Sequence, residues 1–159
     1  MNLSLSGHFP KALLLMAALT MLVSFTAAAE NIADRVTVKD PYIRAVPPVV
    51  KTSAAFMELQ YSGPNQEFLV AAETPAAATV ELHMHEHDNG VMRMRRIPHI
   101  HLPPNETVNL APGGLHIMLF DLQGPLEVDG QVPITLIFAD DSRKEISATV
   151  RSVTRMMKH

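Results

Sequence analysis

Residues 83 to 94 read HMHEHDNGVMRM, and this stretch predicts a β-hairpin. Asn89-Gly90 favours a two-residue turn of type I′, because both central positions of that turn need positive φ. Such a turn would place Asp88 opposite Val91, His87 opposite Met92, His85 opposite Met94 and His83 opposite Arg96. Because opposed residues share a face, three imidazoles and two thioethers would gather on one side of the hairpin. A slip of one residue would undo this arrangement.

A second stretch, LHIML at residues 115 to 119, carries the same two side-chain chemistries on a predicted strand. Successive side chains of a strand point to opposite faces, so Leu115, Ile117 and Leu119 suit a core. His116 and Met118 share the other face and can reach one point. Imidazole and thioether form a soft ligand set, and thioethers select Cu(I) among the common metals. We therefore expect a copper site.

The chain beyond residue 29 alternates apolar, β-branched runs with Pro, Gly, Asn and Asp, which is typical of a β-sandwich or barrel. A short turn of helix is expected at residues 74–78, and no interdomain linker is apparent. The expected strands cover residues 36–39, 42–45, 54–61, 68–72, 79–87, 91–96, 107–110, 115–119, 132–139 and 144–153.

The first 29 residues resemble a signal peptide for export. Lys11 precedes an apolar run at residues 12–26, and Ala27-Ala28-Ala29 fits a cleavage site before Glu30. The run is shorter than the roughly 20 residues that span a bilayer; an uncleaved anchor helix is the alternative. We expect a periplasmic protein without a membrane anchor in its mature form, with one domain over residues 30–153 and a Met- and His-containing tail at residues 154–159.

Composition excludes several classes of protein. The net charge of −3 argues against a nucleic-acid binder, which usually carries a basic patch. The absence of cysteine excludes a blue-copper electron carrier, whose copper needs a thiolate, and a fold held by disulfides. Carboxylates near the His- and Met-rich stretches are few, and no nucleophile motif is present, so we expect no enzyme activity.

The spacing of these residues resembles the signature of the periplasmic copper chaperone family usually called PCuAC. Ten residues separate His83 from Met94, 21 separate Met94 from His116, and one separates His116 from Met118, which gives H-x10-M-x21-H-x-M. The resemblance covers nearly the whole mature chain. The matching blocks are DPYIRA at residues 40–45, SAAFM at 53–57, AAATVELH at 76–83, VMRM at 91–94 and LAPGG at 110–114.

The resemblance implies a cupredoxin-like Greek-key β-barrel, an all-β fold, that binds one Cu(I) through His83, Met94, His116 and Met118. It also implies a chaperone that carries copper toward the copper centre of cytochrome c oxidase. The expected partners are the copper subunit of that oxidase and a Sco-type thioredoxin-like protein.

Other soft or nitrogen donors leave alternatives open. His85 and His87 are expected to be solvated or to bind Cu(II) weakly, and with Met92 they could form a secondary site. Met92 could instead be a fifth soft group near the Cu(I) ion or cover the site, and we expect it to cover the site. His99 and His101 share a face on a short edge strand between Pro98 and Pro103, where exposed histidines are expected.

Two rival functions remain at this point. One is a histidine-rich zinc or copper buffer without a delivery role, and the other is a structural β-domain in the periplasm.

Overall fold

The structure is a computed structural model that describes residues 30–88 and 90–152, without the side chains of His87 and Asp88. The predicted signal segment at 1–29, the tail at 154–159 and Asn89 of the predicted turn lie outside the described residues. In chain order the elements are α1 (Ile32–Arg35), β1 (Val36–Arg44), β2 (Thr52–Tyr61), β3 (Glu67–Glu73), β4 (Ala77–Asp88), β5 (Val91–Arg96), β6 (Ile100–Leu102), β7 (Thr107–Leu110), β8 (Leu115–Leu122), β9 (Gln131–Phe138) and β10 (Arg143–Arg151).

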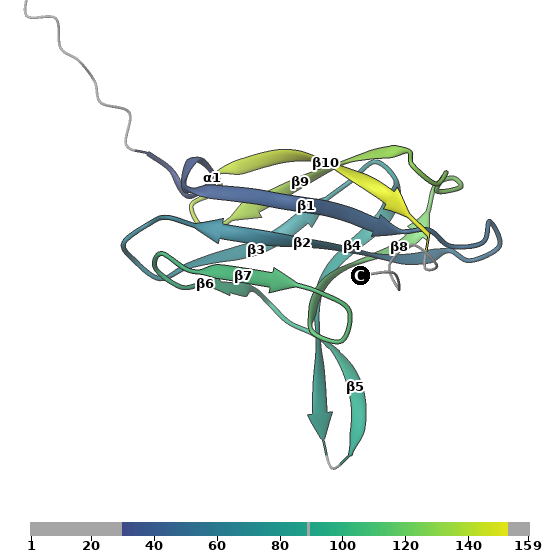
Figure 1. The fold of residues 1–159 in the computed structure, drawn as a ribbon, viewed down its shortest axis with the longest axis horizontal. Helices are drawn as coiled ribbons and strands as arrows, with labels where there is room; N and C mark the ends of the chain where they lie inside the picture. Colours follow the sequence, from purple (N-terminus) through teal and green to yellow (C-terminus); the bar gives the residue numbers. More distant parts are fainter. Residues whose placement is uncertain (1–29, 89, 153–159) are drawn as a thin grey trace, which may run out of the picture.

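The strands form one mixed sheet in the order β5-β4-β8-β7-β2-β1-β10-β9-β3-β6. Neighbours pair antiparallel except β1 with β10 and β7 with β8, which are parallel. The predicted all-β domain is therefore confirmed. Figure 1 shows that the end of β4 and the whole of β5 project from the body of the molecule. The projecting hairpin pairs His83 with Arg96, His85 with Met94 and His87 with Met92, which is the predicted register.

Two local predictions are wrong. Residues 36–39 and 42–45 belong to one strand, β1, whose pairing with β2 shifts between Lys39 and Tyr42. Asp40 has φ 49° and Pro41 lacks an N–H, so the chain forms a bulge and does not end the strand. The predicted turn of helix at residues 74–78 is a tight turn, and β4 begins at Ala77.

The helix α1 was not predicted from the sequence, because four residues are too few to show the periodicity of a helix. Its N-cap is Asn31, whose side chain accepts a hydrogen bond from the N–H of Asp34. The N–H groups of Ile32 and Ala33 donate to side chains of the β9–β10 turn, 2.9 and 3.0 Å away. Among the described residues, no helix has the length and apolarity needed to cross a bilayer.

The two faces of β8 separate the core from the candidate site. Ile117 and Leu119 are fully buried in the main core, and Leu115 packs against its edge, as predicted. Met118 lies on the other face in a smaller apolar cluster with Ala54 and Phe56. The core therefore anchors β8 while its opposite face carries His116 and Met118.

We expect Val36→Ala to lower the free energy of unfolding by about 2–3 kcal/mol, because the side chain is 1% exposed and leaves a cavity. Val49→Ala is the matched control at 86% exposure and should change it by less than about 0.5 kcal/mol. Urea denaturation of both variants measures the difference. Equal losses would contradict the assigned core.

Candidate metal site

His116 is the most buried polar residue of the site, with 2% of its surface exposed. Its Nδ1–H donates to the carbonyl of Gly114 at 2.9 Å, so the lone pair belongs to Nε2. The same carbonyl accepts the N–H of His85 at 3.2 Å. The turn before β8 makes this possible because Gly113 adopts φ +83°, which favours glycine. One carbonyl thus orients the ring of β8 and ties it to β4.

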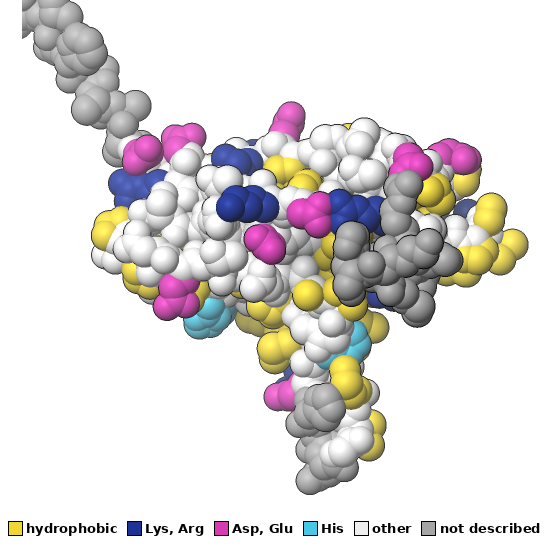
Figure 2. All heavy atoms as spheres, viewed as in Figure 1, with side chains coloured by type: hydrophobic (Ala, Val, Ile, Leu, Met, Phe, Trp, Pro, Cys, Tyr) yellow, Lys and Arg dark blue, Asp and Glu magenta, His cyan; other side chains and the backbone are white. Residues whose placement is uncertain are grey.

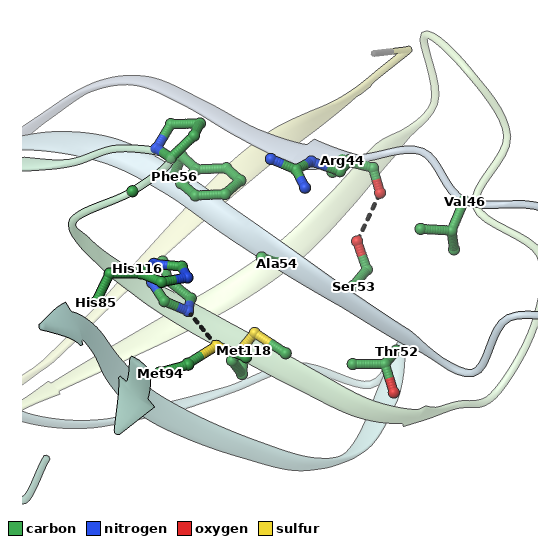
Figure 3. A pocket seen from close by; sticks show the side chains of 12 residues that line it. Arg44, Val46, Thr52, Ser53, Ala54, Phe56, His85, Met94, His116 and Met118 are labelled. Atoms are coloured by element: carbon green, nitrogen blue, oxygen red, sulfur yellow. Dashed lines mark hydrogen bonds between the residues drawn. The ribbon is translucent and has the colours of Figure 1, made fainter. Parts of the chain in front are cut away.

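The thioether of Met94 meets the free nitrogen of His116. The distance from Nε2 of His116 to Sδ of Met94 is 3.1 Å. Met94 comes from β5 and is 49% exposed, so it closes the site from the solvent side. Figure 3 shows Met94 and Met118 near the His116 ring, from different strands. Both thioethers, His116 and His85 line one cavity of about 280 Å³.

His83 lies directly across from His116 on β4, with ring centroids 5.9 Å apart. It does not line the cavity; its Nε2–H donates to Oε2 of Glu81 at 2.8 Å. Glu81 also pairs with Arg96 at 3.2 Å. The Nδ1 of His83 is buried and has no hydrogen-bond partner among the described residues. Glu81 is half-buried and orients a predicted ligand.

His85 is nearer to the cavity than the sequence indicated. It is half-buried, lines the cavity and stacks on His116 with centroids 5.0 Å apart and an interplanar angle of 30°. Its Nδ1 is also buried without a partner among the described residues. The ring of His85 is therefore only partly solvated, because it stacks on His116 of β8, and the weak Cu(II) role expected for it stays a prediction.

Met92 lies on the hairpin beyond the pair formed by His85 and Met94. Met92 is 47% exposed and is not among the residues that line the cavity, and its expected role as a cover of the ion stays a prediction. His87 pairs with Met92 along the backbone, and its side chain lies outside the description. The structure therefore leaves the Cu(II) prediction for His85 and His87 untested.

The sequence did not predict which residues form the side of the cavity opposite the hairpin. Phe56 of β2 lies 6.2 Å from the His116 ring between centroids, and the guanidinium of Arg44 lies 5.5 Å from the Phe56 ring. Ala54 pairs directly with Met118. The i, i+2 spacing of Ala54 and Phe56 showed that they share a face, but only the pairing of β2 with β8 reveals which residues they cover.

Burial lowers the pKa of the His116 imidazole below its ordinary value, because the ring loses water that would solvate its charged form. The bond to Gly114 opposes this shift, whereas the nearby His85, His83 and Arg44 reinforce it. A neutral ring nitrogen beside a thioether in a mainly apolar cavity is suited to a soft cation.

Comparison with known proteins identifies the family of this chain. A family model described as "Putative lipoprotein LpqE-like" matches residues 36–150. The chain is 32% identical over 120 residues to "Putative lipoprotein Lxx21020" of Leifsonia xyli subsp. xyli, an alignment that covers 75% of this chain and 71% of that protein.

Solved structures share the fold. The solution structure of apo-DR1885 from Deinococcus radiodurans has 32% identity and a TM-score of 0.60, covering 96% of this chain and 97% of that one. The Cu(I) form of DR1885 has 31% identity and a TM-score of 0.63, covering 78% and 83%. The copper-bound PCuAC domain from PmoF2 has 24% identity and a TM-score of 0.65, covering 77% and 97%, and supports the fold alone.

The family model spans most of the described chain, and the likeness to DR1885 extends over nearly the full length of both proteins. This chain therefore belongs to the LpqE-like family, and its β fold is shared with solved PCuAC domains.

Proposed function

We propose that this protein binds one Cu(I) ion through His83, Met94, His116 and Met118 and delivers it as a periplasmic chaperone. The observation that carries the proposal is the 3.1 Å approach of Nε2 of His116 to Sδ of Met94. Two such donors on one tetrahedral ion would lie roughly 3.5 Å apart, so a small adjustment admits the metal. The Cu(I) form of DR1885 supports copper as the cargo.

His83 would supply the second nitrogen through Nδ1. Its other nitrogen is already held by Glu81, and a carboxylate behind a ligating histidine fixes the tautomer and raises ligand basicity. The buried, unpartnered Nδ1 is then the atom left for the metal. His85 competes for this role because it lines the cavity, so His83→Asn and His85→Asn belong in the same titration. The larger loss of Cu(I) affinity is expected for His83→Asn.

Neutral imidazoles and thioethers leave the positive charge of Cu(I) uncompensated. Such a site holds the ion less firmly than thiolates do, which favours transfer to an acceptor with cysteine ligands. The proposed acceptors are the copper subunit of cytochrome c oxidase and a Sco-type thioredoxin-like protein. The signal-like segment and the family description as a lipoprotein support a location outside the cytoplasm, and we propose the periplasm.

The alternative is a zinc or copper buffer without a delivery role. The two thioethers in the cavity favour copper, because a zinc site would rely on nitrogen, thiolate and carboxylate donors. A competition between Zn²⁺ and Cu(I) separates the two functions.

Met94→Leu should weaken Cu(I) binding by at least roughly tenfold, because even the loss of outer-shell partners commonly costs 10–100-fold. Met92→Leu is the matched control: it makes the same change two residues away on an exposed side chain outside the cavity. It should leave the affinity within about twofold. Anaerobic competition with a chromogenic Cu(I) chelator measures both. Two results would contradict a role for the Met94 thioether in Cu(I) binding. One is an equal loss of affinity in both variants, and the other is a preference for Zn²⁺ over Cu(I) that is the same in wild type and Met94→Leu.

The pKa of His116 gives the metal-free protein a pH signature. Because this pKa is lower in the folded state, its contribution to stability is complete above about pH 6.5 and declines as the pH falls below that value. Melting temperatures of wild type and His116→Asn, measured from about pH 8 to about pH 5, should diverge in slope, with the variant less sensitive to acid. Parallel curves would show that His116 is not held neutral by the fold.

Delivery is tested by mixing the Cu(I)-loaded protein with a purified, metal-free copper subunit of cytochrome c oxidase and, separately, with a Sco-type protein. Transfer should be faster than release of Cu(I) to buffer, because Met94 is exposed and an acceptor that contacts this side of the site can take the ion directly. Absorption of the acceptor follows the reaction. Transfer no faster than passive release would leave binding intact and reject the chaperone role.

A further inference from the structure

His99 and His101 form a second histidine pair that the copper site does not use. His101 lies on β6 and His99 immediately precedes that strand, so both project to one face while Ile100 and Leu102 enter the core. Their Nε2 atoms lie 3.3 Å apart. His101 is exposed and His99 half-buried, so the expectation of two exposed rings holds only for His101.

Phe68 holds both rings in place. It pairs with His101 across β3 and β6. Its ring meets His99 and His101 nearly edge-on, with centroid distances of 4.7 and 5.1 Å and angles of 73° and 75°. Both imidazoles are thus ordered before any ligand arrives, which lowers the entropic cost of binding.

This pair is separate from the copper site. The two rings border a cavity of about 360 Å³ whose other walls include Met84, Ile97 and Leu115. Met84 projects from the opposite face of β4 to His83 and His85, because side chains alternate along a strand. Figure 2 shows histidine side chains in two separate places, one at the base of the hairpin and one beneath β6.

We propose that His99 and His101 chelate a divalent transition-metal ion, with Cu(II) bound most strongly. Two imidazole nitrogens on one ion lie roughly 3.3 Å apart in a tetrahedral site and roughly 2.8 Å apart at neighbouring corners of the square-planar site that Cu(II) prefers, so the 3.3 Å separation already present needs at most a small closure. Imidazole suits Cu(II), Ni(II) and Zn(II), and affinities in this series peak at Cu(II). No group of three or more His, Cys, Asp and Glu side chains is arranged for a metal within the described residues, so water would complete the coordination.

Without a metal, the same contact is a hydrogen bond in which one Nε2–H donates to the other ring. Metal binding replaces that proton, so the bound ion should compete with protons at both nitrogens. The proposal is independent of the Cu(I) site, since it uses none of its residues.

The test uses the full mature chain and Cu(II) ions alone. Substoichiometric Cu(II) should broaden the backbone NMR signals of residues 67–69 and 99–102, because a paramagnetic ion relaxes nearby nuclei. His101→Asn and, separately, His99→Asn should abolish this broadening while leaving the rest of the spectrum unchanged. The matched control His85→Asn should keep it.

Two outcomes would overturn the site. One is no broadening at residues 99–102, including broadening confined to the hairpin, which would leave the pair as a hydrogen bond between two rings. The other is broadening at residues 99–102 that both His99→Asn and His101→Asn retain. Both variants are measured because a local folding defect in one of them could abolish the broadening without any role of that side chain in metal binding.

Discussion

The register of β4 against its two neighbours, β8 and β5, is the constraint on which the proposed copper site depends. β8 places His116 opposite His83, and β5 places Met94 opposite His85. A shift of one residue along either partner would turn donors from one face to the other. The carbonyl of Gly114 secures this register, because it accepts hydrogen bonds from the backbone of His85 and the ring of His116.

The two faces of β8 have different roles: one packs into the apolar core, and the other carries the polar candidate site. Ile117 and Leu119 bury against the main core and hold the strand rigid, while Met118 packs with Ala54 and Phe56 on the other side. That second cluster shields His116 from water, and the shielding lowers the pKa of the imidazole. Burial that stabilises the domain therefore also favours the unprotonated imidazole, which is the form that binds a metal.

Sequence reasoning succeeded where one strand or one tight turn decides the outcome. The register of the hairpin followed from Asn89-Gly90, and the faces of β8 followed from alternation. It did not place Glu81 against His83 or His85 against His116, because alternation assigns a side chain to a face without showing what covers that face. The bulge at Asp40 and the short α1 were missed for a related reason, since contacts with distant segments stabilise both.

The sequence by itself determined an all-β chain, the pairing within the hairpin and the set of soft donors at family spacing. These follow from period-two alternation, turn chemistry and residue type, which are local properties. Only the tertiary structure decided that Phe56 faces His116, that Glu81 holds His83 and that Phe68 brings His99 and His101 to 3.3 Å. Those contacts join segments that are distant in sequence or depend on side-chain rotamers, and packing in three dimensions selects them.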